Sequence, residues 1–182
     1  GKFYGMTPEE LKKQFDDLGL IPLSIHMGMV NLDNADKLIA DVKAAGFKYF
    51  VAPVPPMGLA KFNREARSMS MTDNVDSLVL ILNTLGQKCK AAGLEFLYHN
   101  HNFEFIEKVN GQLIYDIILK ETDPELVIHQ LDFGNMFGIG ARGMDWIKKY
   151  PGRFVSVHVK DESKVPIGEM NDQHDSTILG NG

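Results

Sequence analysis

Hydrophobic and polar positions along the chain follow two alternating periods. Runs with apolar residues three or four positions apart predict five helices, over residues 7–18, 33–45, 73–92, 112–121 and 144–150. Short, nearly continuous apolar runs predict five strands, over residues 21–26, 47–54, 94–97, 126–132 and 154–159. Strands that alternate with helices in this way predict a parallel sheet with helical crossovers, so the expected fold class is α/β.

Local signals mark several boundaries of these elements. The sequence Thr7-Pro8-Glu9-Glu10 has the form of a capping box, with Thr as the N-cap and Pro in the first turn. Glycines follow the first three helices as expected stops, at positions 19, 46 and 93. The stretch 57–71 shows no period, and we expect a long loop of the lid or binding type there. The tail 161–182 is polar and has no clear period either.

The segment 98–105 carries a dense group of titratable side chains. It follows the apolar strand 94–97 and reads Tyr-His-Asn-His-Asn-Phe-Glu-Phe. Residues two apart in an extended strand share a face, so His99 and His101 are expected to point the same way, with Glu104 just beyond the strand end. Polar groups are costly to bury at the end of an apolar strand unless they bind something. The segment is therefore a candidate binding or catalytic site.

Other predicted strands also end in titratable side chains. These are His26 at the first strand, Asp132 at the fourth, and His158 and Lys160 at the fifth. In a (β/α)8 barrel, the carboxyl ends of several strands bring active-site groups to one rim. A doubly wound dinucleotide-binding fold would need a glycine fingerprint after an early strand, and the glycines of 134–140 come late with the wrong spacing. We therefore expect a (β/α)8 TIM-barrel type over residues 1–182 as one domain, partial because only about five strands are found.

Composition narrows the class of protein further. The chain has 182 residues, of which 44% are hydrophobic and 24% charged, as in an ordinary soluble globular domain. A net charge of −5 without a basic run disfavours a nucleic-acid partner, and no apolar run is long enough to suggest a membrane span. The single cysteine, Cys89, excludes an internal disulfide and is expected in the core. We expect a cytoplasmic location, with a periplasmic or secreted one left open because the chain opens with Gly rather than Met.

Imidazoles and carboxylates that converge from different strands can form a nitrogen- and oxygen-donor metal site. Such a site suits one divalent ion of Mn, Co, Zn, Fe or Mg, which would polarise a carbonyl or hydroxyl group. A neighbouring carboxylate or histidine can then remove a proton from the adjacent carbon. This chemistry isomerises, epimerises or dehydrates a polyol or keto sugar, so a small sugar is the expected partner.

Several of these residues could instead have a purely structural role. His26 could be a buried or supporting histidine, and Asp132, followed by Phe-Gly-Asn, could belong to an Asx turn. Lys160 could form a surface ion pair with its neighbour rather than bind substrate. His129 is expected to be structural, and His174 is expected to be solvated in the tail.

Three segments carry a resemblance to a known family: Leu97–Phe105, Gln130–Asn135 and Ser156–Asp161, supported by Ser24–Gly28. In order and spacing they resemble strand ends of the xylose isomerase-like TIM-barrel superfamily, in particular its sugar phosphate isomerase/epimerase branch. The resemblance extends over essentially the whole chain. It implies a TIM barrel that binds one divalent metal ion and acts on sugars.

The resemblance also implies roles for the rim residues. Asp132 and His158 match metal ligands of the sixth and seventh strands, and the fifth-strand ligand is either His99 or Glu104. The resemblance and the rim position together assign further roles to five residues. The roles are substrate binding by His26, Asn135 and His101, and catalysis by His101, Glu104 and Lys160.

The eighth-strand Glu of the family, usually both ligand and acid/base, has no counterpart in these residues. We therefore expect these 182 residues alone to bind metal weakly and to be inactive, and a longer parent chain to be the enzyme.

Three functions remain open at this stage. The preferred one is a metal-dependent isomerase or epimerase that abstracts a proton next to the carbonyl of a sugar or keto sugar. The alternatives are an inosose-type dehydratase or lyase on the same site and a non-catalytic sugar-binding domain. A repair endonuclease of the same fold is disfavoured, because Asn135 stands where its metal cluster needs a ligand and a basic surface is lacking. Whether the protein forms a homo-oligomer is left open.

Overall fold

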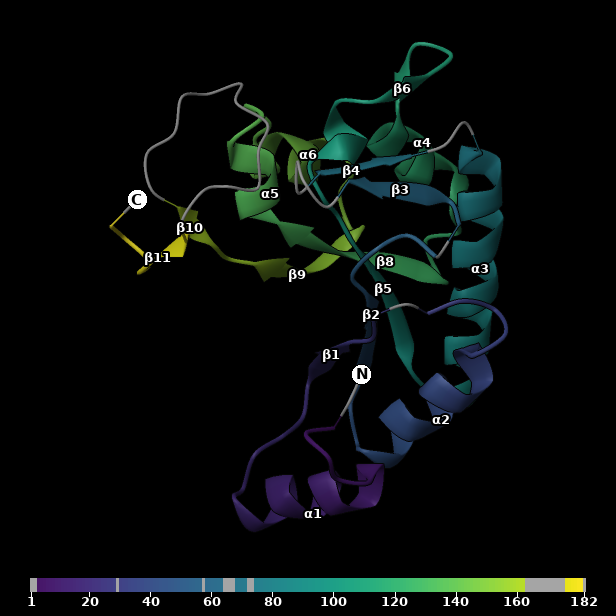
Figure 1. Ribbon diagram of the computed structural model, residues 1–182, viewed down its shortest axis with the longest axis vertical. Helices are drawn as coiled ribbons and strands as arrows, with labels where there is room; N and C mark the ends of the chain where they lie inside the picture. The colour runs from purple at the N-terminus through teal and green to yellow at the C-terminus, as the bar shows by residue number, and fades with distance from the viewer. Residues whose placement is uncertain are drawn as a thin grey trace.

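A curved parallel sheet organises the molecule in the computed structural model, which describes residues 3–28, 30–56, 58–63, 68–71, 74–162 and 176–181 (Figure 1). The sheet has five strands in the order β1-β2-β5-β8-β9. These strands are β1 (Ser24–His26), β2 (Tyr49–Ala52), β5 (Glu95–His99), β8 (Val127–Asp132) and β9 (Phe154–His158). Each is parallel to the next, as the alternating sequence pattern predicted.

The register of the sheet brings its polar strand ends together. His99 of β5 pairs with Gln130 of β8, and Asp132 of β8 pairs with His158 of β9. Because the strands are adjacent in chain order and parallel, their carboxyl ends lie along one edge of the sheet. The sheet is curved as part of a (β/α)8 barrel, which confirms the predicted partial barrel.

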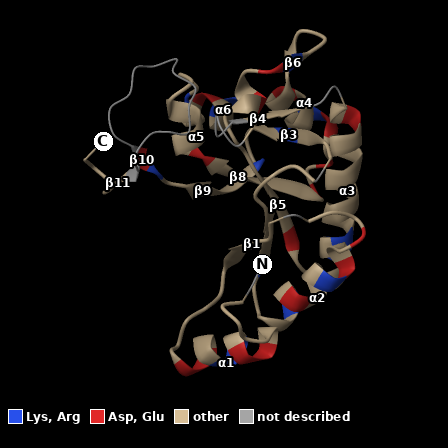
Figure 2. Cartoon of the chain, in the orientation of Figure 1, with Lys and Arg blue, Asp and Glu red and all other residues tan. Residues whose placement is uncertain are grey.

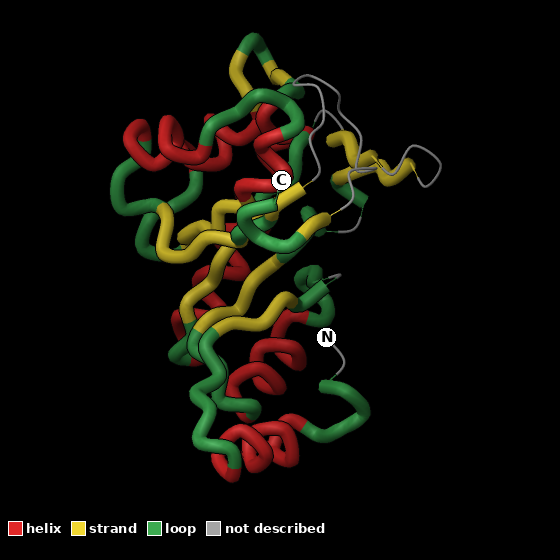
Figure 3. The backbone as a smooth tube through the Cα atoms, turned by 90° about the vertical axis from the view of Figure 1, so that its left-hand side faces the viewer, coloured by secondary structure: helices red, strands yellow, loops and turns green. Residues whose placement is uncertain are grey.

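Helices cover the outer face of this sheet. They are α1 (Pro8–Asp17), α2 (Ala35–Ala44), α3 (Val75–Ala92), α4 (Ile114–Glu121), α5 (Phe133–Phe137) and α6 (Gly143–Lys149). In sequence order, α1 contacts α2, α2 contacts α3, and α3 contacts α4. The side view in Figure 3 shows the strands across the middle of the molecule, with helices above and below them. The buried core fills the layer between the helices and the sheet, with Phe50, Leu82, Phe96 and Ile118 fully or almost fully buried.

Local sequence signals explain where several helices begin and end. Thr7 and Glu10 form the predicted capping box, with the Thr7 amide donating to Glu10 Oε2 at 2.8 Å and the Glu10 amide to Thr7 Oγ1 at 3.2 Å. Gly93 ends α3 in the left-handed conformation, at a φ of 80°. Gly86 lies on α3 where any side chain would meet the carbonyl oxygen of Leu126, so it permits close packing of this helix on the segment before β8.

The structure corrects the sequence interpretation at three places. The stretch 57–71 is not a loop without structure, because β3 (Ala60–Asn63) and β4 (Ser68–Met71) pair in it as an antiparallel hairpin. The helix predicted from residue 112 begins at 114, since β6 (Lys108–Val109) and β7 (Gln112–Leu113) form a second hairpin around Asn110 and Gly111, both at positive φ. This Asn-Gly pair is a recognised hairpin signal.

The third correction concerns the regions next to the strands that carry the site. The short helix α5 follows β8 directly and was not predicted. In the tail, β10 (Asp161–Glu162) pairs with β11 (Ser176–Thr177). A short 3-10 turn, η1 (Phe103–Phe105), follows the segment after β5. His174 lies outside the described residues.

A buried polar group fastens α4 to the start of β8 and β9. The Arg153 guanidinium donates to the carbonyl of Leu119, to Thr122 Oγ1 at 2.8 Å and to the carbonyl of Val127 at 3.1 Å. It also approaches His129 Nε2 at 3.4 Å. Burial holds the pKa of His129 well below its usual value, so its ring is neutral. The predicted structural role of this histidine agrees with these contacts.

The lone cysteine and the surface charges follow expectation. Cys89 is buried, and burial raises the pKa of its thiol to about 12, which removes its nucleophilic character. Figure 2 shows acidic and basic residues interspersed along α1 and α2. Several of these form i,i+4 pairs, such as Lys12 with Asp16 and Lys37 with Asp41. Within the described part of the chain, no helix combines the length and apolar character that crossing a membrane requires.

Candidate metal centre

Histidines from three strands gather at the carboxyl-end edge of the sheet. The ring of His99 lies 4.9 Å from that of His26, 5.5 Å from that of His101 and 5.4 Å from that of His158, measured between centroids. His26 ends β1, His99 ends β5 and His158 ends β9. The structure therefore brings together the four histidines that the sequence placed on one rim.

Asp132 lies at the centre of this group and is fully buried. Its Oδ1 accepts a hydrogen bond from the Asn135 amide at 2.8 Å and so caps α5. Its Oδ2 lies 3.4 Å from His99 Nε2 and 3.0 Å from His158 Nδ1. The turn occupies only Oδ1 of the carboxylate, so the predicted Asx-type turn leaves Oδ2 directed at the histidines.

The donor atoms of His99, Asp132 and His158 suit a divalent cation. One ligand atom from each lies within 4.8 Å of the others. Asp132 Oδ2 and His158 Nδ1 are buried, form no hydrogen bond and lie 3.0 Å apart, with the Lys160 ammonium 3.0 Å from the carboxylate oxygen. A cation between them would satisfy both, and two imidazoles with a carboxylate match the preference of Zn²⁺, Mn²⁺, Co²⁺ and Fe²⁺.

Burial keeps the imidazoles of the centre neutral. It lowers the pKa of His99 to about 3 and that of His101 to about 4, although Asp132 acts in the opposite direction on both. Burial also lowers the pKa of His158. Neutral imidazole is the form that binds metal ions, so these rings need lose no proton to do so near pH 7.

Lys160 supplies the positive charge nearest to the carboxylate. Its Nζ lies 3.0 Å from Asp132 Oδ2 and donates to Asn135 Oδ1 at 3.0 Å. The predicted substrate group Asn135 is therefore held by Lys160 and by its own bond to the Asn100 carbonyl at 2.9 Å. The position of Lys160 at the centre favours the site interpretation over the surface ion pair.

Glu104, predicted as an alternative metal ligand and as a catalytic group, is turned away from this centre. It lies on η1, where its Oε1 accepts from the Tyr98 hydroxyl at 2.7 Å and its Oε2 from the His101 amide at 2.8 Å. Complete burial raises its pKa to about 7. Both oxygens are occupied, so the geometry favours His99 over Glu104 as the ligand from this segment.

Two residues that the sequence interpretation missed support the centre. Gln130 Oε1 lies 2.6 Å from His26 Nε2 and 3.0 Å from His99 Nδ1. Asn100 accepts from the Asp132 amide at 2.8 Å and donates to the Asp132 carbonyl at 3.2 Å. The period of two in a strand could have found Gln130, because it stands two residues before Asp132 and shares its face.

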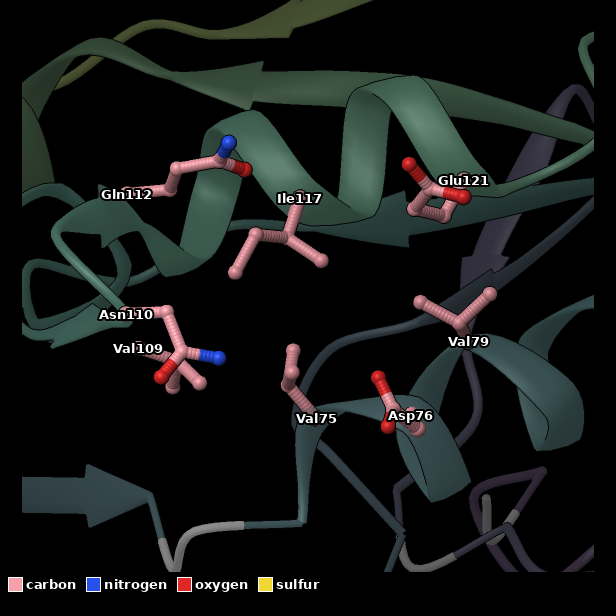
Figure 4. Close-up of a pocket in the computed structure, with 8 residues that line it drawn as sticks. All are labelled: Val75, Asp76, Val79, Val109, Asn110, Gln112, Ile117 and Glu121. Atoms are coloured by element: carbon pink, nitrogen blue, oxygen red, sulfur yellow. The ribbon is translucent and has the colours of Figure 1, made fainter.

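A separate pocket lies away from the predicted site residues. Figure 4 shows it between α3, α4 and the β6–β7 turn, with a volume of about 360 Å³. Apolar side chains such as Val75, Val79 and Ile117 line it together with the carboxylates of Asp76 and Glu121. None of the histidines of the candidate centre contributes to it.

Comparison with known sequences relates the chain to inosose dehydratases. No model of a known protein family matches the chain. An inosose dehydratase from Clostridium perfringens is 29% identical over 99 residues, which cover 54% of this chain and 32% of that enzyme. One from Mesomycoplasma hyopneumoniae is 30% identical over 105 residues, or 58% of this chain and 34% of that enzyme. The matched part of the chain thus spans about a third of the length of these relatives.

Comparison with solved structures relates the whole fold to one superfamily. A sugar phosphate isomerase/epimerase from Parabacteroides distasonis superposes with a TM-score of 0.70 at 27% identity, over 91% of this chain and 61% of its own. An IOLI protein with a bound zinc atom has the same fold, with a TM-score of 0.68 at 18% identity, over 96% of this chain and 63% of its own. The curved parallel sheet, the polar rim at its strand ends and these neighbours show that the chain has the fold of sugar phosphate isomerase/epimerase and xylose isomerase-like TIM-barrel proteins, as the sequence resemblance predicted.

Proposed function

We propose that the chain forms the metal-binding part of the active site of an isomerase or epimerase that acts on a sugar or keto sugar. The observation that carries the proposal is the convergence of His99, Asp132 and His158, with two buried ligand atoms that lack hydrogen-bond partners. The sugar phosphate isomerase/epimerase of similar fold and the zinc-bound IOLI protein support the reaction class and the metal.

The proposed ligands are His99 Nε2, Asp132 Oδ2 and His158 Nδ1. A divalent ion of Zn, Mn, Co, Fe or Mg, bound there, would supply Lewis-acid polarisation of a substrate carbonyl or hydroxyl. The fixed positions of the three strand ends mean that little rearrangement is needed to bring these ligands together.

The remaining rim residues are proposed to handle the substrate. His101 Nδ1 is buried without a hydrogen-bond partner, and its ring is neutral near pH 7, so it can accept a proton or a hydroxyl hydrogen bond. The Lys160 ammonium can donate to an oxygen on which negative charge develops, and Asn135 holds that ammonium in place. His26 is proposed to bind a substrate hydroxyl group.

A dehydratase that acts on an inosose or a related keto sugar is the second candidate. The similarity to inosose dehydratases from Clostridium perfringens and Mesomycoplasma hyopneumoniae favours it. Both reactions begin with loss of a proton from the carbon next to a carbonyl. They differ in whether that proton returns or a hydroxyl group leaves.

The test follows this proton in deuterated water with the intact protein that carries these residues, supplied with Mn²⁺. An isomerase or epimerase incorporates deuterium next to the carbonyl of a ketose without loss of water, seen by NMR. A dehydratase instead produces a conjugated carbonyl compound from an inosose, seen by ultraviolet absorbance.

Asp132→Asn should abolish either reaction, whereas Asp17→Asn on the exposed surface of α1 should leave it unchanged. Sugar binding without either reaction, in wild-type protein shown to contain the ion, would overturn both candidates in favour of a non-catalytic sugar-binding domain.

A further inference from the structure

Gln130 makes contacts in the candidate centre that neither the metal ligands nor the proposed substrate groups account for. Its side chain is 8% exposed, and its single amide oxygen lies within hydrogen-bond distance of two imidazoles from two other strands. It stands directly beside His99 in the register of β5 and β8. The amide therefore connects His26 on β1 with His99 on β5 across the intervening strand β2.

An amide oxygen can only accept hydrogen bonds, and this fixes the hydrogen on each ring. His99 Nδ1, at 3.0 Å, must carry a hydrogen to donate to Gln130 Oε1. His26 Nε2, at 2.6 Å, must carry one for the same reason. A neutral imidazole has one hydrogen, so His99 keeps its lone pair on Nε2 and His26 keeps its lone pair on Nδ1.

Two acceptors compete for the single hydrogen of a neutral His99 ring. Gln130 Oε1 lies 3.0 Å from Nδ1, and Asp132 Oδ2 lies 3.4 Å from Nε2. The contact to Gln130 is the shorter one, and the Lys160 ammonium, 3.0 Å from Asp132 Oδ2, already offsets the charge of that carboxylate. Without Gln130 as an acceptor, the hydrogen would move to Nε2 and donate to Asp132, which would occupy the nitrogen proposed to bind the ion.

We propose that Gln130 is a positioning residue that sets the tautomers of both histidines, so that His99 presents Nε2 to the metal ion and His26 presents Nδ1 as an acceptor for a substrate hydroxyl. The part that concerns the ion and the substrate rests on the proposed function, whereas the tautomers themselves do not. Supporting groups of this kind typically contribute roughly 10- to 100-fold to metal affinity.

The experiment compares Gln130→Met with Gln130→Glu in the metal-free 182-residue chain. Met has a similar length but no oxygen acceptor, and Glu keeps an acceptor at the same place. Imidazole nitrogen chemical shifts from two-bond ¹H–¹⁵N NMR spectra distinguish protonated from unprotonated ring nitrogens. Wild type and Gln130→Glu should show His99 with hydrogen on Nδ1 and His26 with hydrogen on Nε2.

Gln130→Met should move the His99 hydrogen to Nε2, and it should weaken Mn²⁺ binding roughly 10- to 100-fold. The matched control is Gln14→Met on the exposed face of α1, which should change neither result. Unchanged tautomers in Gln130→Met would overturn the proposal even if the ion binds. Shifted tautomers, together with an intact wild-type protein that binds no Mn²⁺, would confirm the positioning role and refute the proposed function instead.

Discussion

Asn100 should contribute more to stability than its place in a loop segment suggests. It is fully buried at the end of β5, where its side chain exchanges two hydrogen bonds with the main chain of Asp132, at 2.8 and 3.2 Å. Asn100→Ala would leave the buried amide of Asp132 without its partner and remove one of the donors to its carbonyl, which as the N-cap of α5 keeps a helical hydrogen bond. An unsatisfied buried group costs about 1–3 kcal/mol and a lost hydrogen bond about 1 kcal/mol, so we expect a loss of about 2–4 kcal/mol in the free energy of unfolding.

The assay is urea unfolding of the metal-free chain followed by circular dichroism. Asn83→Ala is the control, because it removes one exposed hydrogen bond, from the Asp123 amide, and should cost about 1 kcal/mol or less. A loss below about 1 kcal/mol for Asn100→Ala would refute the reasoning that this amide joins the ends of β5 and β8.

Three further predictions concern the buried ionisable groups. Stability of the metal-free chain should fall as the pH drops below about 6.5. In the unfolded chain the histidines are protonated below that pH, whereas in the folded chain the pKa of His101 is about 4 and that of His99 about 3. Urea unfolding at pH 5 and pH 7 measures the difference. Glu104 has the opposite effect, because its raised pKa of about 7 makes stability fall as the pH rises from about 4.5 to 7. Glu104→Gln removes this effect and should make stability depend more steeply on pH over that range. An unchanged slope would argue against the burial of Glu104. Arg153→Met should lower the free energy of unfolding by about 3–5 kcal/mol, because it removes the hydrogen bonds to two buried main-chain carbonyls and to Thr122. A change near zero in urea unfolding would show that the guanidinium is dispensable.

The fold could be predicted because its signals are local and repeated. Apolar runs bounded by glycine stops and a capping box located the five parallel strands and most helices to within a few residues. The β3–β4 hairpin escaped because its strands are short and polar, with Phe62 among its exposed residues. The β6–β7 hairpin had a readable signal in Asn110-Gly111 that the helical pattern after it obscured.

The candidate centre could be predicted only where a residue's strand position determines its direction. Asp132, His158 and His99 end adjacent strands, so their convergence follows from the parallel register. Glu104 stands beyond the strand, and the turn at η1 sends its carboxylate to Tyr98 instead, which no strand rule anticipates. Asn100 likewise acts through contacts with another strand's main chain, which depend on the assembled fold.

His99, Asp132 and His158 are proposed to bind one divalent ion. Mn²⁺ titrated into the ¹⁵N-labelled 182-residue chain tests it most directly, because the paramagnetic ion broadens only nearby resonances and reports weak binding as well as strong. We predict early broadening of the imidazole signals of His99 and His158, lost in Asp132→Asn and retained in Asp17→Asn. Broadening centred on the exposed carboxylates of α1, or unchanged in Asp132→Asn, would contradict the claim.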